Sequence, residues 1–362
     1  MKHCLKSDWT PLLMDWFDTH KRDLPWRTES PRDPYKVWVS EIMLQQTRVE
    51  AVRSYYINWM EHFPDIPSLA AAEEDEVVRQ WQGLGYYSRA RNLHTAVREV
   101  MATYGGRVPE TREEIRRLKG IGDYTAGAVL SMAYGKRETA VDGNVLRVFA
   151  RIYNIEENIL SAKVKKEITA LVRVRQDAAR PGDFNEALMD LGATVCIPGQ
   201  PRCEVCPLSS VCKAKAAGKE AEIPLRVKKK EVPVEPVTVF VMRAGELYLL
   251  HRRPSKGLLA GMWEFPNCVG EGGQGKKALT AELAAIGVRV EEVSGPVKQI
   301  RHVFSHKVWQ MSVYEARAAK DVIFPPVVPP GWRWVPVTEL ADFNLAGPHN
   351  RILRDMNELT TK

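Results

Sequence analysis

The stretch Leu118-Lys119-Gly120-Ile121-Gly122-Asp123-Tyr124-Thr125 decides how the first part of this chain folds. Its two glycines separate a charged helical segment, Glu113 to Leu118, from a segment of small residues, Thr125 to Ala133. This pattern predicts two helices joined by a tight hairpin, because glycine reaches positive φ and lets another backbone come close. Backbone N–H groups at the start of the second helix are then free to bind a phosphate oxygen. The stretch therefore predicts a hairpin that binds a nucleic-acid backbone.

A single acid follows this hairpin, in the run Val141-Asp142-Gly143-Asn144. Downstream of it, apolar residues recur at helical spacing and predict one buried helix face: Val145, Val148, Phe149 and Ile152. Asp142 therefore lies at a helix N-terminus, where the helix dipole and free N–H groups favour an ionised carboxylate. A plain helix cap or an Asp-Gly turn is the common role of such a residue. A DNA-binding hairpin followed by a lone acid is also the outline of a base-excision enzyme.

Composition places the chain among soluble globular proteins, with 44% hydrophobic and 27% charged residues, and its 362 residues indicate two domains. A net charge of +7 favours a polyanionic partner, although many basic proteins bind nothing acidic. No run approaches the length of a transmembrane helix, and the first residues lack the apolar core of a signal peptide. We therefore expect a cytosolic protein in which the six cysteines form no disulfide framework.

The sequence divides into two parts of different pattern. Residues 8–218 are mostly helical, with helices expected at Trp9 to His20, Tyr35 to Trp59 and Glu73 to Trp81. Residues 219–236 form a charged, proline-containing linker that includes Lys228-Lys229-Lys230-Glu231. Residues 237–362 form a smaller α+β domain, with strands at Val237 to Met242, Leu247 to Leu250 and Val303 to Tyr314 and a loop at Gly270 to Gly275.

Four cysteines, Cys196, Cys203, Cys206 and Cys212, have the spacing C-x6-C-x2-C-x5-C. Four thiolates within seventeen residues of a cytosolic chain indicate a metal site rather than unrelated free thiols. Zinc and an iron–sulfur cluster both accept four cysteines. Structural zinc usually draws on two short ligand pairs, whereas only one C-x2-C occurs here, so the spacing favours the cluster and leaves zinc open. Cys4 and Cys268 lie far from these four in the sequence and are not expected to be ligands.

The hairpin, Asp142 and the cysteine spacing together resemble the endonuclease III superfamily of helix-hairpin-helix DNA glycosylases. The segments Trp38 to Thr47 (WVSEIMLQQT), Gly83 to Arg89 (GLGYYSR) and Phe304-Ser305-His306 narrow the resemblance to the MutY family, over nearly the whole chain. This family removes adenine opposite 8-oxoguanine or guanine. The resemblance implies an all-α glycosylase domain with a [4Fe-4S] cluster in the loop 196–212, and a Nudix-like C-terminal domain. It also implies a monomer that acts on double-stranded DNA, away from membranes, in the bacterial cytoplasm and associated with the nucleoid.

Release of adenine is glycosidase chemistry, in which a protonated carboxyl feeds the leaving group and an ionised one faces the sugar. Glu41 is the candidate acid, because its apolar neighbours raise a carboxyl pKa. A surface or ion-paired helical glutamate is the alternative. The resemblance makes Glu41 the proton donor to adenine N7, and makes Asp142 the group that stabilises or bonds the sugar C1′. Asn144 and Tyr124 would support this site, Tyr124 by hydrogen bonding near Asp142.

Tyr124 and Asp123 are two residues of the hairpin region that bear on activity and on DNA binding. In the strand-cleaving relatives, the position of Tyr124 holds a lysine that forms a Schiff base with the sugar. A phenol cannot do this, so we predict a monofunctional glycosylase with little or no lyase activity. Asp123 places a negative charge inside the phosphate-binding hairpin, where it either caps the second helix or weakens the phosphate contact.

Further site residues are implied by the resemblance. Gln46 and Tyr86 match residues that wedge into the base stack, with helix surface and aromatic packing as the plainer roles. Arg27 and Glu186 match residues that line the adenine pocket, with a buried salt bridge as the alternative. The remaining substrate-binding residues are Leu44, Thr47 and Leu84, and the residues that contact the DNA backbone are Lys119, Gly120 and Gly122.

The C-terminal part lacks the clustered glutamates that would hold Mg²⁺ for Nudix hydrolysis, as the stretch Thr280 to Val288 shows. The resemblance instead makes it a lesion reader, with Phe304 stacking on 8-oxoguanine, Ser305 hydrogen bonding and His306 contacting the base or its flank. A plain hairpin turn is the alternative. For the whole chain, two other functions stay open: a noncatalytic DNA-binding protein, and a thymine- or oxidised-pyrimidine-specific glycosylase of the same superfamily.

Overall fold

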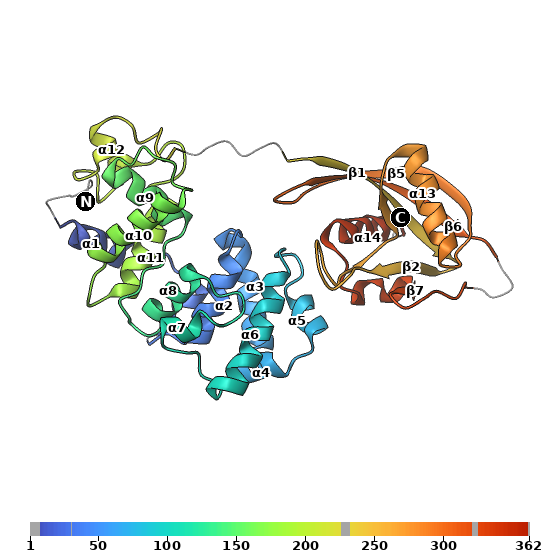
Figure 1. The fold of residues 1–362 in the computed structure, drawn as a ribbon, viewed down its shortest axis with the longest axis horizontal. Helices are drawn as coiled ribbons and strands as arrows, with labels where there is room; N and C mark the ends of the chain where they lie inside the picture. Colours follow the sequence, from blue (N-terminus) through green and yellow to red (C-terminus); the bar gives the residue numbers. More distant parts are fainter. Residues whose placement is uncertain (1–7, 30, 226–231, 321–324, 361–362) are drawn as a thin grey trace. The chain divides into compact units, whose positions relative to one another are not determined.

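The computed structural model describes residues 8–29, 31–225, 232–320 and 325–360 of the chain. These residues form two compact units, one made of helices and one built on a β-sheet (Figure 1). The fold class predicted from the sequence, an all-α part followed by a smaller part with helices and a sheet, is confirmed. The predicted linker stretch Lys228 to Glu231 lies outside the described residues.

The helical unit contains the helices α1 Thr10–His20, α2 Pro34–Leu44, α3 Val49–His62, α4 Ile66–Ala71, α5 Glu74–Gln80, α6 Ser88–Tyr104, α7 Arg112–Ile115, α8 Asp123–Met132, α9 Gly143–Tyr153, α10 Ala162–Arg175, α11 Pro181–Thr194 and α12 Lys213–Ala216. Short 3-10 helices lie at η1 Pro25–Arg27 and η2 Cys203–Val205. The segment expected as one or two helices from Tyr35 to Trp59 is two, because the chain turns between Leu44 and Val49 with Gln46 at a φ of 60°.

The core of this unit is organised around α9, and it holds the start of that helix in place. The face predicted from its spacing is buried as expected, from Val145 to Ile152. Trp9 lies edge-on to Phe149 of α9, with ring centroids 5.7 Å apart, and stacks on Phe184 of α11 at 6.3 Å. Burial of each such ring stabilises the fold by about 1.5–3 kcal/mol. This packing determines where Asp142, the residue before α9, lies.

Two glycines let neighbouring helices approach the same region closely. A Cβ at Gly127 of α8 would lie 2.0 Å from the carbonyl oxygen of Thr139, on the segment that leads to Asp142. A Cβ at Gly192 of α11 would lie 2.6 Å from the Cβ of Asn144. Neither contact is sterically possible for another residue without a shift of backbone, so both glycines are needed for α8 and α11 to enclose the start of α9.

The second unit contains the strands β1 Val234–Ala244, β2 Leu247–Arg252, β3 Trp263–Glu264, β4 Asn267–Val269, β5 Val290–Val303, β6 Val308–Ala318 and β7 Trp332–Pro336. They form one sheet of order β3-β2-β1-β6-β5, with β4 pairing with β1 and β7 with β2. The β1–β6 pair is parallel and the other strand pairs are antiparallel. β5 therefore forms one edge of the sheet and pairs only with β6 among the described residues.

Two helices cover the two faces of this sheet, α13 Gly272–Ala285 and α14 Gly347–Thr360 (Figure 1). Alternate residues of β1 enter opposite clusters, since successive side chains of a strand point to opposite faces. Val239 belongs to the cluster that includes Ile352 and Leu353 of α14, whereas Phe240 belongs to the cluster that includes Leu279 of α13. The result is a three-layer unit.

Two details of this unit differ from the sequence-based expectation. β1 begins at Val234, inside the segment expected as linker, because its first residues pair with β6. The prediction of a loop from Gly270 to Gly275 is wrong from Gly272 onward, since α13 begins at that residue. Gly275 belongs in that helix because a Cβ there would lie 2.1 Å from the Thr238 hydroxyl oxygen, so α13 approaches β1 closely. None of the helices in the described ranges is long and apolar enough to cross a membrane.

Candidate active site

One pocket of about 630 Å³ in the helical unit brings together most of the residues predicted to act on the substrate. Those that line it are Arg27, Glu41, Leu44, Gln46, Thr47, Gly120, Gly122, Tyr124, Asp142, Asn144 and Glu186. The pocket has the size of a small-molecule site and can hold a nucleoside. Predicted substrate or backbone residues of this unit that do not line it are Leu84, Tyr86 and Lys119. The sequence analysis missed other lining residues, among them Arg22, Trp26, Gln45 and Met189.

Glu41, on α2, is a buried carboxyl in this pocket, with 5% of its surface exposed. Burial raises its pKa to about 7, and the nearby charges of Glu186 and Asp142 act in the same direction. A hydrogen bond from the Tyr124 hydroxyl to Oε2, 2.5 Å long, acts in the opposite direction. Glu41 is therefore not the surface glutamate of the alternative interpretation, and its carboxyl is partly protonated at neutral pH.

Tyr124 differs from the prediction in its partner. The sequence analysis placed its hydrogen bond near Asp142, but the phenol donates to Glu41 instead. The reason is geometric: Tyr124 lies in the first turn of α8, and α8 packs directly against α2, which carries Glu41. Tyr124 thus orients the candidate proton donor rather than the second acid.

Asp142 is the N-cap of α9, as predicted, and its carboxylate accepts two hydrogen bonds. Oδ1 accepts from the backbone N–H of Val145 at 2.8 Å, and Oδ2 accepts from Nδ2 of Asn144 at 2.9 Å. The side chain of Asn144 is itself held by Arg147, which donates to its Oδ1 at 2.8 Å. Asn144 therefore supports Asp142, as expected.

The N–H groups at the helix end favour the ionised form of Asp142, as predicted, but burial of the carboxyl acts against them. Loss of water around the carboxyl raises the pKa of Asp142 above its ordinary value. The hydrogen bonds from Val145 and Asn144 lower that pKa but do not fully offset the desolvation. A carboxylate held with too little solvent is stabilised most by a cation that enters its pocket.

Arg27 and Glu186 form the salt bridge that was the alternative to a purine contact, and they also line the pocket. Arg27 Nε lies 2.8 Å from Oε1 of Glu186, and its Nη1 lies 2.7 Å from Oδ2 of Asp190. Arg22 also binds Asp190, with Nη2 2.6 Å from Oδ1. Arg32 binds both carboxylate oxygens of Glu186 at 2.6 Å. The two interpretations are therefore compatible, since an ion network can hold both residues at the pocket wall.

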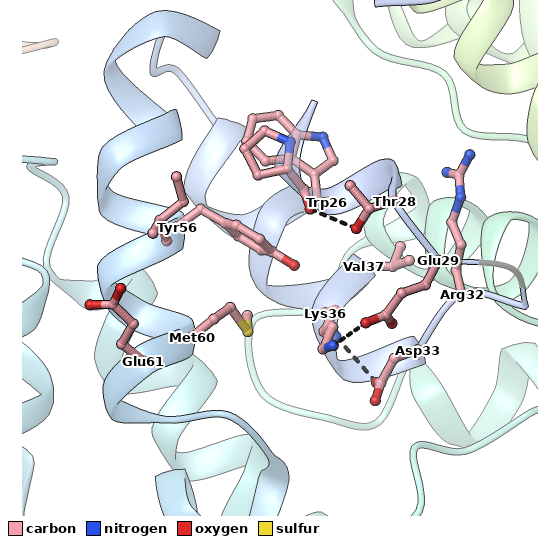
Figure 2. A pocket seen from close by; sticks show the side chains of 12 residues that line it. Trp26, Thr28, Glu29, Arg32, Asp33, Lys36, Val37, Tyr56, Met60 and Glu61 are labelled. Carbon is pink, nitrogen blue, oxygen red and sulfur yellow. Dashed lines mark hydrogen bonds and ion pairs between the residues drawn. The ribbon is translucent and has the colours of Figure 1, made fainter. Parts of the chain in front are cut away.

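Arg32 was missed by the sequence analysis, because no periodicity or motif distinguishes it from other charged loop residues. It lines a second pocket of about 310 Å³, together with Trp26, Tyr56 and Met60 (Figure 2). Figure 2 shows its guanidinium directed away from Met60. Trp26 lines both pockets and packs edge-on against Tyr56, with ring centroids 5.4 Å apart. Trp26 is therefore shared by the two pockets, whereas Tyr56 lines only the second.

The glycine hairpin has the predicted form. Gly120 has a φ of 85°, and a Cβ there would lie 2.9 Å from the Cβ of Asn92, so glycine is required. Gly122 is the N-cap of α8 and supplies no side-chain cap, which leaves the first N–H groups of that helix available. Asp123 does not cap the helix: it forms ion pairs with Arg116 and, at 3.7 Å, with Arg112.

Gln46 and Tyr86 occupy strained backbone positions, with φ values of 60° and 50°. Left-handed conformations of residues other than glycine are uncommon and concentrate at functional sites. Both side chains are exposed. Gln46 lies in the turn between α2 and α3 and not on a helix surface, which was the plainer role considered for it. Arg89, which was not predicted as a site residue, holds the two segments: it donates to the carbonyl of Gln45 at 2.6 Å and to that of Leu84 at 3.1 Å.

All four cysteines Cys196, Cys203, Cys206 and Cys212 line one further pocket. Within the described ranges, no three His, Cys, Asp or Glu side chains are arranged as ligands of a single metal ion. Four cysteine sulfurs at one pocket are a donor set that suits zinc and an iron–sulfur cluster alike. Arg151, buried beside them, donates to Sγ of Cys196 at 3.3 Å. Cys268 lies in β4, and Cys4 lies outside the described residues.

Phe304, Ser305 and His306 form the turn between β5 and β6. The backbone N–H of Phe304 donates to the carbonyl of Lys307 at 2.8 Å, so the hairpin turn of the alternative interpretation is present. The Phe304 ring packs edge-on against Trp309, with centroids 5.0 Å apart, while Ser305 and His306 are exposed. The turn thus presents two polar side chains on a fixed aromatic base.

Comparison with known proteins identifies the two units. Residues 39–173 match the HhH-GPD superfamily of base excision DNA repair proteins, and residues 237–355 match the NUDIX domain. The chain is 37% identical to an adenine DNA glycosylase of Mus musculus, over 94% of this chain and 76% of the relative. It is 36% identical to the adenine DNA glycosylase of Homo sapiens, over 89% of this chain and 69% of the relative. A solved thermostable thymine-DNA glycosylase superposes with a TM-score of 0.53 at 30% identity, covering 58% of this chain and 95% of that structure.

These relatives correct one expectation and identify the family. The expectation of a bacterial, cytoplasmic, nucleoid-associated protein is wrong, since relatives from mouse, human, Arabidopsis thaliana and Schizosaccharomyces pombe give no ground for it. The match to adenine DNA glycosylases extends over both units and over most of the length of those relatives. The chain belongs to the adenine DNA glycosylases, the helix-hairpin-helix enzymes of base excision DNA repair that carry a C-terminal Nudix-like domain.

Proposed function

We propose that the chain hydrolyses the N-glycosidic bond of adenine paired with 8-oxoguanine or guanine in double-stranded DNA, as a monomer. The observation that carries this proposal is the pair Glu41 and Asp142, which line one pocket large enough for a nucleoside. Extrusion of the adenine from the duplex costs a few kcal/mol. The exposed Gln46 and Tyr86 fill the space that the base leaves.

Glu41 gives its proton to N7 of adenine, because its pKa of about 7 keeps a useful fraction protonated at neutral pH. Tyr124 holds the carboxyl in place through its hydrogen bond. The base then leaves as a neutral species, and the sugar acquires oxocarbenium character. Asp142, fixed by Val145 and Asn144, stabilises or transiently bonds C1′, since a carboxylate short of solvent favours a developing cation. Water completes the hydrolysis.

Two groups of residues would hold the nucleic acid around this step. Arg27 and Glu186, kept at the wall by their ion network, supply donors and acceptors for the purine edge, with Leu44 and Thr47 beside them. The exposed Lys119 and the N–H groups near Gly120 and Gly122 bind backbone phosphates. Leu84 is buried and contributes through the position of its loop rather than through contact.

The cysteine set holds a [4Fe-4S] cluster, bound by Cys196, Cys203, Cys206 and Cys212. The cluster supplies structural cross-linking of the loop 196–212 and sensing of DNA, and the hydrolytic step does not pass through it. The single C-x2-C supports this choice over zinc, and the four cysteines line one pocket. An absorption spectrum of the purified protein tests it, because a colourless, zinc-containing protein contradicts the cluster.

The central experiment measures free adenine from duplexes that hold adenine opposite 8-oxoguanine, guanine or thymine. We expect release with the first two and little with the third. A duplex with thymine opposite guanine tests the rival activity, the release of thymine by an enzyme similar to the solved thymine-DNA glycosylase. Release of thymine instead of adenine, or binding without release of any base, contradicts the proposal and favours one of the two rival functions.

Two further measurements test finer parts of the proposal. Because Tyr124 cannot form a Schiff base, borohydride should trap no efficient enzyme–DNA adduct, and an efficient adduct contradicts the monofunctional assignment. The lesion-reading role is tested by Ser305→Ala combined with His306→Ala. This variant should lose preference for 8-oxoguanine over guanine while its adenine release opposite guanine persists. Unchanged preference removes the turn from recognition.

A further inference from the structure

A hollow of about 310 Å³ on the sheet unit is lined mainly by cationic residues. Lys298 and Arg301 come from β5, and Arg351 and Arg354 come from α14, with Gln299 and Ile300 between them. The described residues that line it include no carboxylate. Four like charges around one hollow create a positive potential that attracts an anion.

Packing explains how these side chains come together. Ile300 of β5 is buried in the same cluster as Ile352 and Leu353 of α14, so strand and helix meet through these apolar residues. The charged neighbours of this contact, Arg301 and Arg351, are forced to its exposed rim. Charges on an edge strand also prevent edge-to-edge aggregation. That reason does not apply to the arginines of a helix, so the four cations need a common explanation.

The hollow lies beside the turn that holds Phe304. Arg301 precedes Phe304 by three residues on an extended strand, a separation of about 10 Å. Burial lowers the pKa of His302, and the nearby charge of Arg351 acts in the same direction. The His302 ring in turn packs against that of Phe304, with centroids 4.5 Å apart. The cationic hollow and the turn therefore belong to one continuous surface of this unit.

We propose that this hollow binds a backbone phosphate of the DNA strand whose base the turn Phe304 to His306 contacts. Successive nucleotides of one DNA strand lie about 3.4 Å apart along the helix axis, so about 10 Å corresponds to a phosphate about three nucleotides from that base. Arginine is suited to such a site because its planar fork binds phosphate oxygens in pairs. The inference rests on the proposed function, in which that base is 8-oxoguanine. A free nucleotide carries the same anionic group and is the competing source.

The test compares two double variants of the full chain with equal change in charge. Arg351→Gln with Arg354→Gln removes the helix side of the hollow, and both residues are exposed. The matched control is Arg243→Gln with Arg317→Gln, exposed arginines of the same unit that line no part of the hollow. Affinity is measured between 50 and 200 mM salt for a duplex with 8-oxoguanine opposite a stable abasic-site analogue. Circular dichroism checks that each variant is folded, and Arg354→Gln alone serves if the double variant is not.

Loss of one phosphate contact should reduce the slope of log affinity against log salt by about 0.9. The wild type should then lose about 3.5-fold more affinity over this salt range than the hollow variant, and the control should match the wild type. An unchanged slope in the hollow variant overturns the proposal, as does an equal change in the control. Titration with inorganic triphosphate tests the competing source. If the wild type binds triphosphate, and the hollow variant loses that binding but keeps full DNA affinity, the assignment to DNA is overturned. The binding measurement requires no release of adenine. It therefore tests the phosphate site even if the wild type releases no adenine and the proposed function fails.

Discussion

Glu41→Gln should make the protein more stable and much less active, and the pH dependence of both effects follows from one pKa. The ordinary pKa of the glutamate carboxyl is 4.5, and burial in the fold raises it to about 7. At about 1.4 kcal/mol per pH unit, this difference is about 3 kcal/mol. Because the folded pKa lies above the unfolded one, stability is lost as pH rises from about 4.5 to about 7. The ionised carboxylate therefore destabilises the fold above neutral pH.

Glutamine cannot ionise, and its amide oxygen can still accept the hydrogen bond from Tyr124. We therefore expect Glu41→Gln to raise the free energy of unfolding by about 3 kcal/mol at pH 8.5 and by less than about 1 kcal/mol at pH 5. Urea titration at these two pH values measures the difference. Single-turnover adenine release should fall by about 10²- to 10⁴-fold, the usual contribution of a general acid, while DNA binding persists.

The matched control is Glu61→Gln, because Glu61 is an exposed glutamate of the neighbouring α3. It should change neither stability nor release at either pH. If Glu41→Gln stabilises the protein equally at pH 5 and pH 8.5, the gain does not come from ionisation and the argument from burial fails. If release is near normal, Glu41 is not the proton donor.

Three other substitutions test neighbouring parts of the site. Asp142→Asn should lower single-turnover release by orders of magnitude while DNA still binds; in the wild type, whose Asp142 has a raised pKa, release should also decline as the pH falls through that pKa, and a flat acid side of the profile counts against an ionised Asp142. Tyr124→Phe removes a hydrogen bond that lowers the pKa of Glu41, so the alkaline decline of release should move to higher pH, and an unmoved profile contradicts that coupling. Arg32→Gln leaves Glu186 with one arginine partner and should lower the free energy of unfolding by about 1–3 kcal/mol in urea titration, whereas no change shows that the buried pair contributes nothing.

Much of this fold could be predicted from the sequence, because local rules govern its main elements. The spacing of Val145 to Ile152 predicts the buried face of α9, and the two glycines predict the hairpin before α8. Both features depend on residues close together in the chain. The start of α13 at Gly272 could not be predicted, since glycine usually opposes helices and the reason for Gly275 in this helix, its close approach to Thr238, is a tertiary contact.

The candidate site could be predicted by residue but not by partner. Glu41, Tyr124 and Asp142 were expected together, yet which of the two acids the phenol binds depends on how α8 packs against α2. Periodicity does not encode that contact. Arg32 was missed for the same reason, because its ion pair with Glu186, at 2.6 Å, forms only when α11 packs beside it. Partners distant in the chain are determined by packing rather than by local pattern.

Besides Asp123, which forms ion pairs with Arg116 and Arg112, the pocket holds three carboxyl groups, and their contacts differ in how far they stabilise an ionised carboxylate. Glu186 is bound by two arginines, whose positive charges compensate its own. Asp142 has no such cation in direct contact among the described residues, but it accepts two N–H bonds. Glu41 has only a neutral phenol, and the charges of the other two acids act against its ionisation. Of these three, Glu41 therefore has the fewest contacts that stabilise an ionised carboxylate, and it is the group from which the adenine takes a proton in the proposed mechanism.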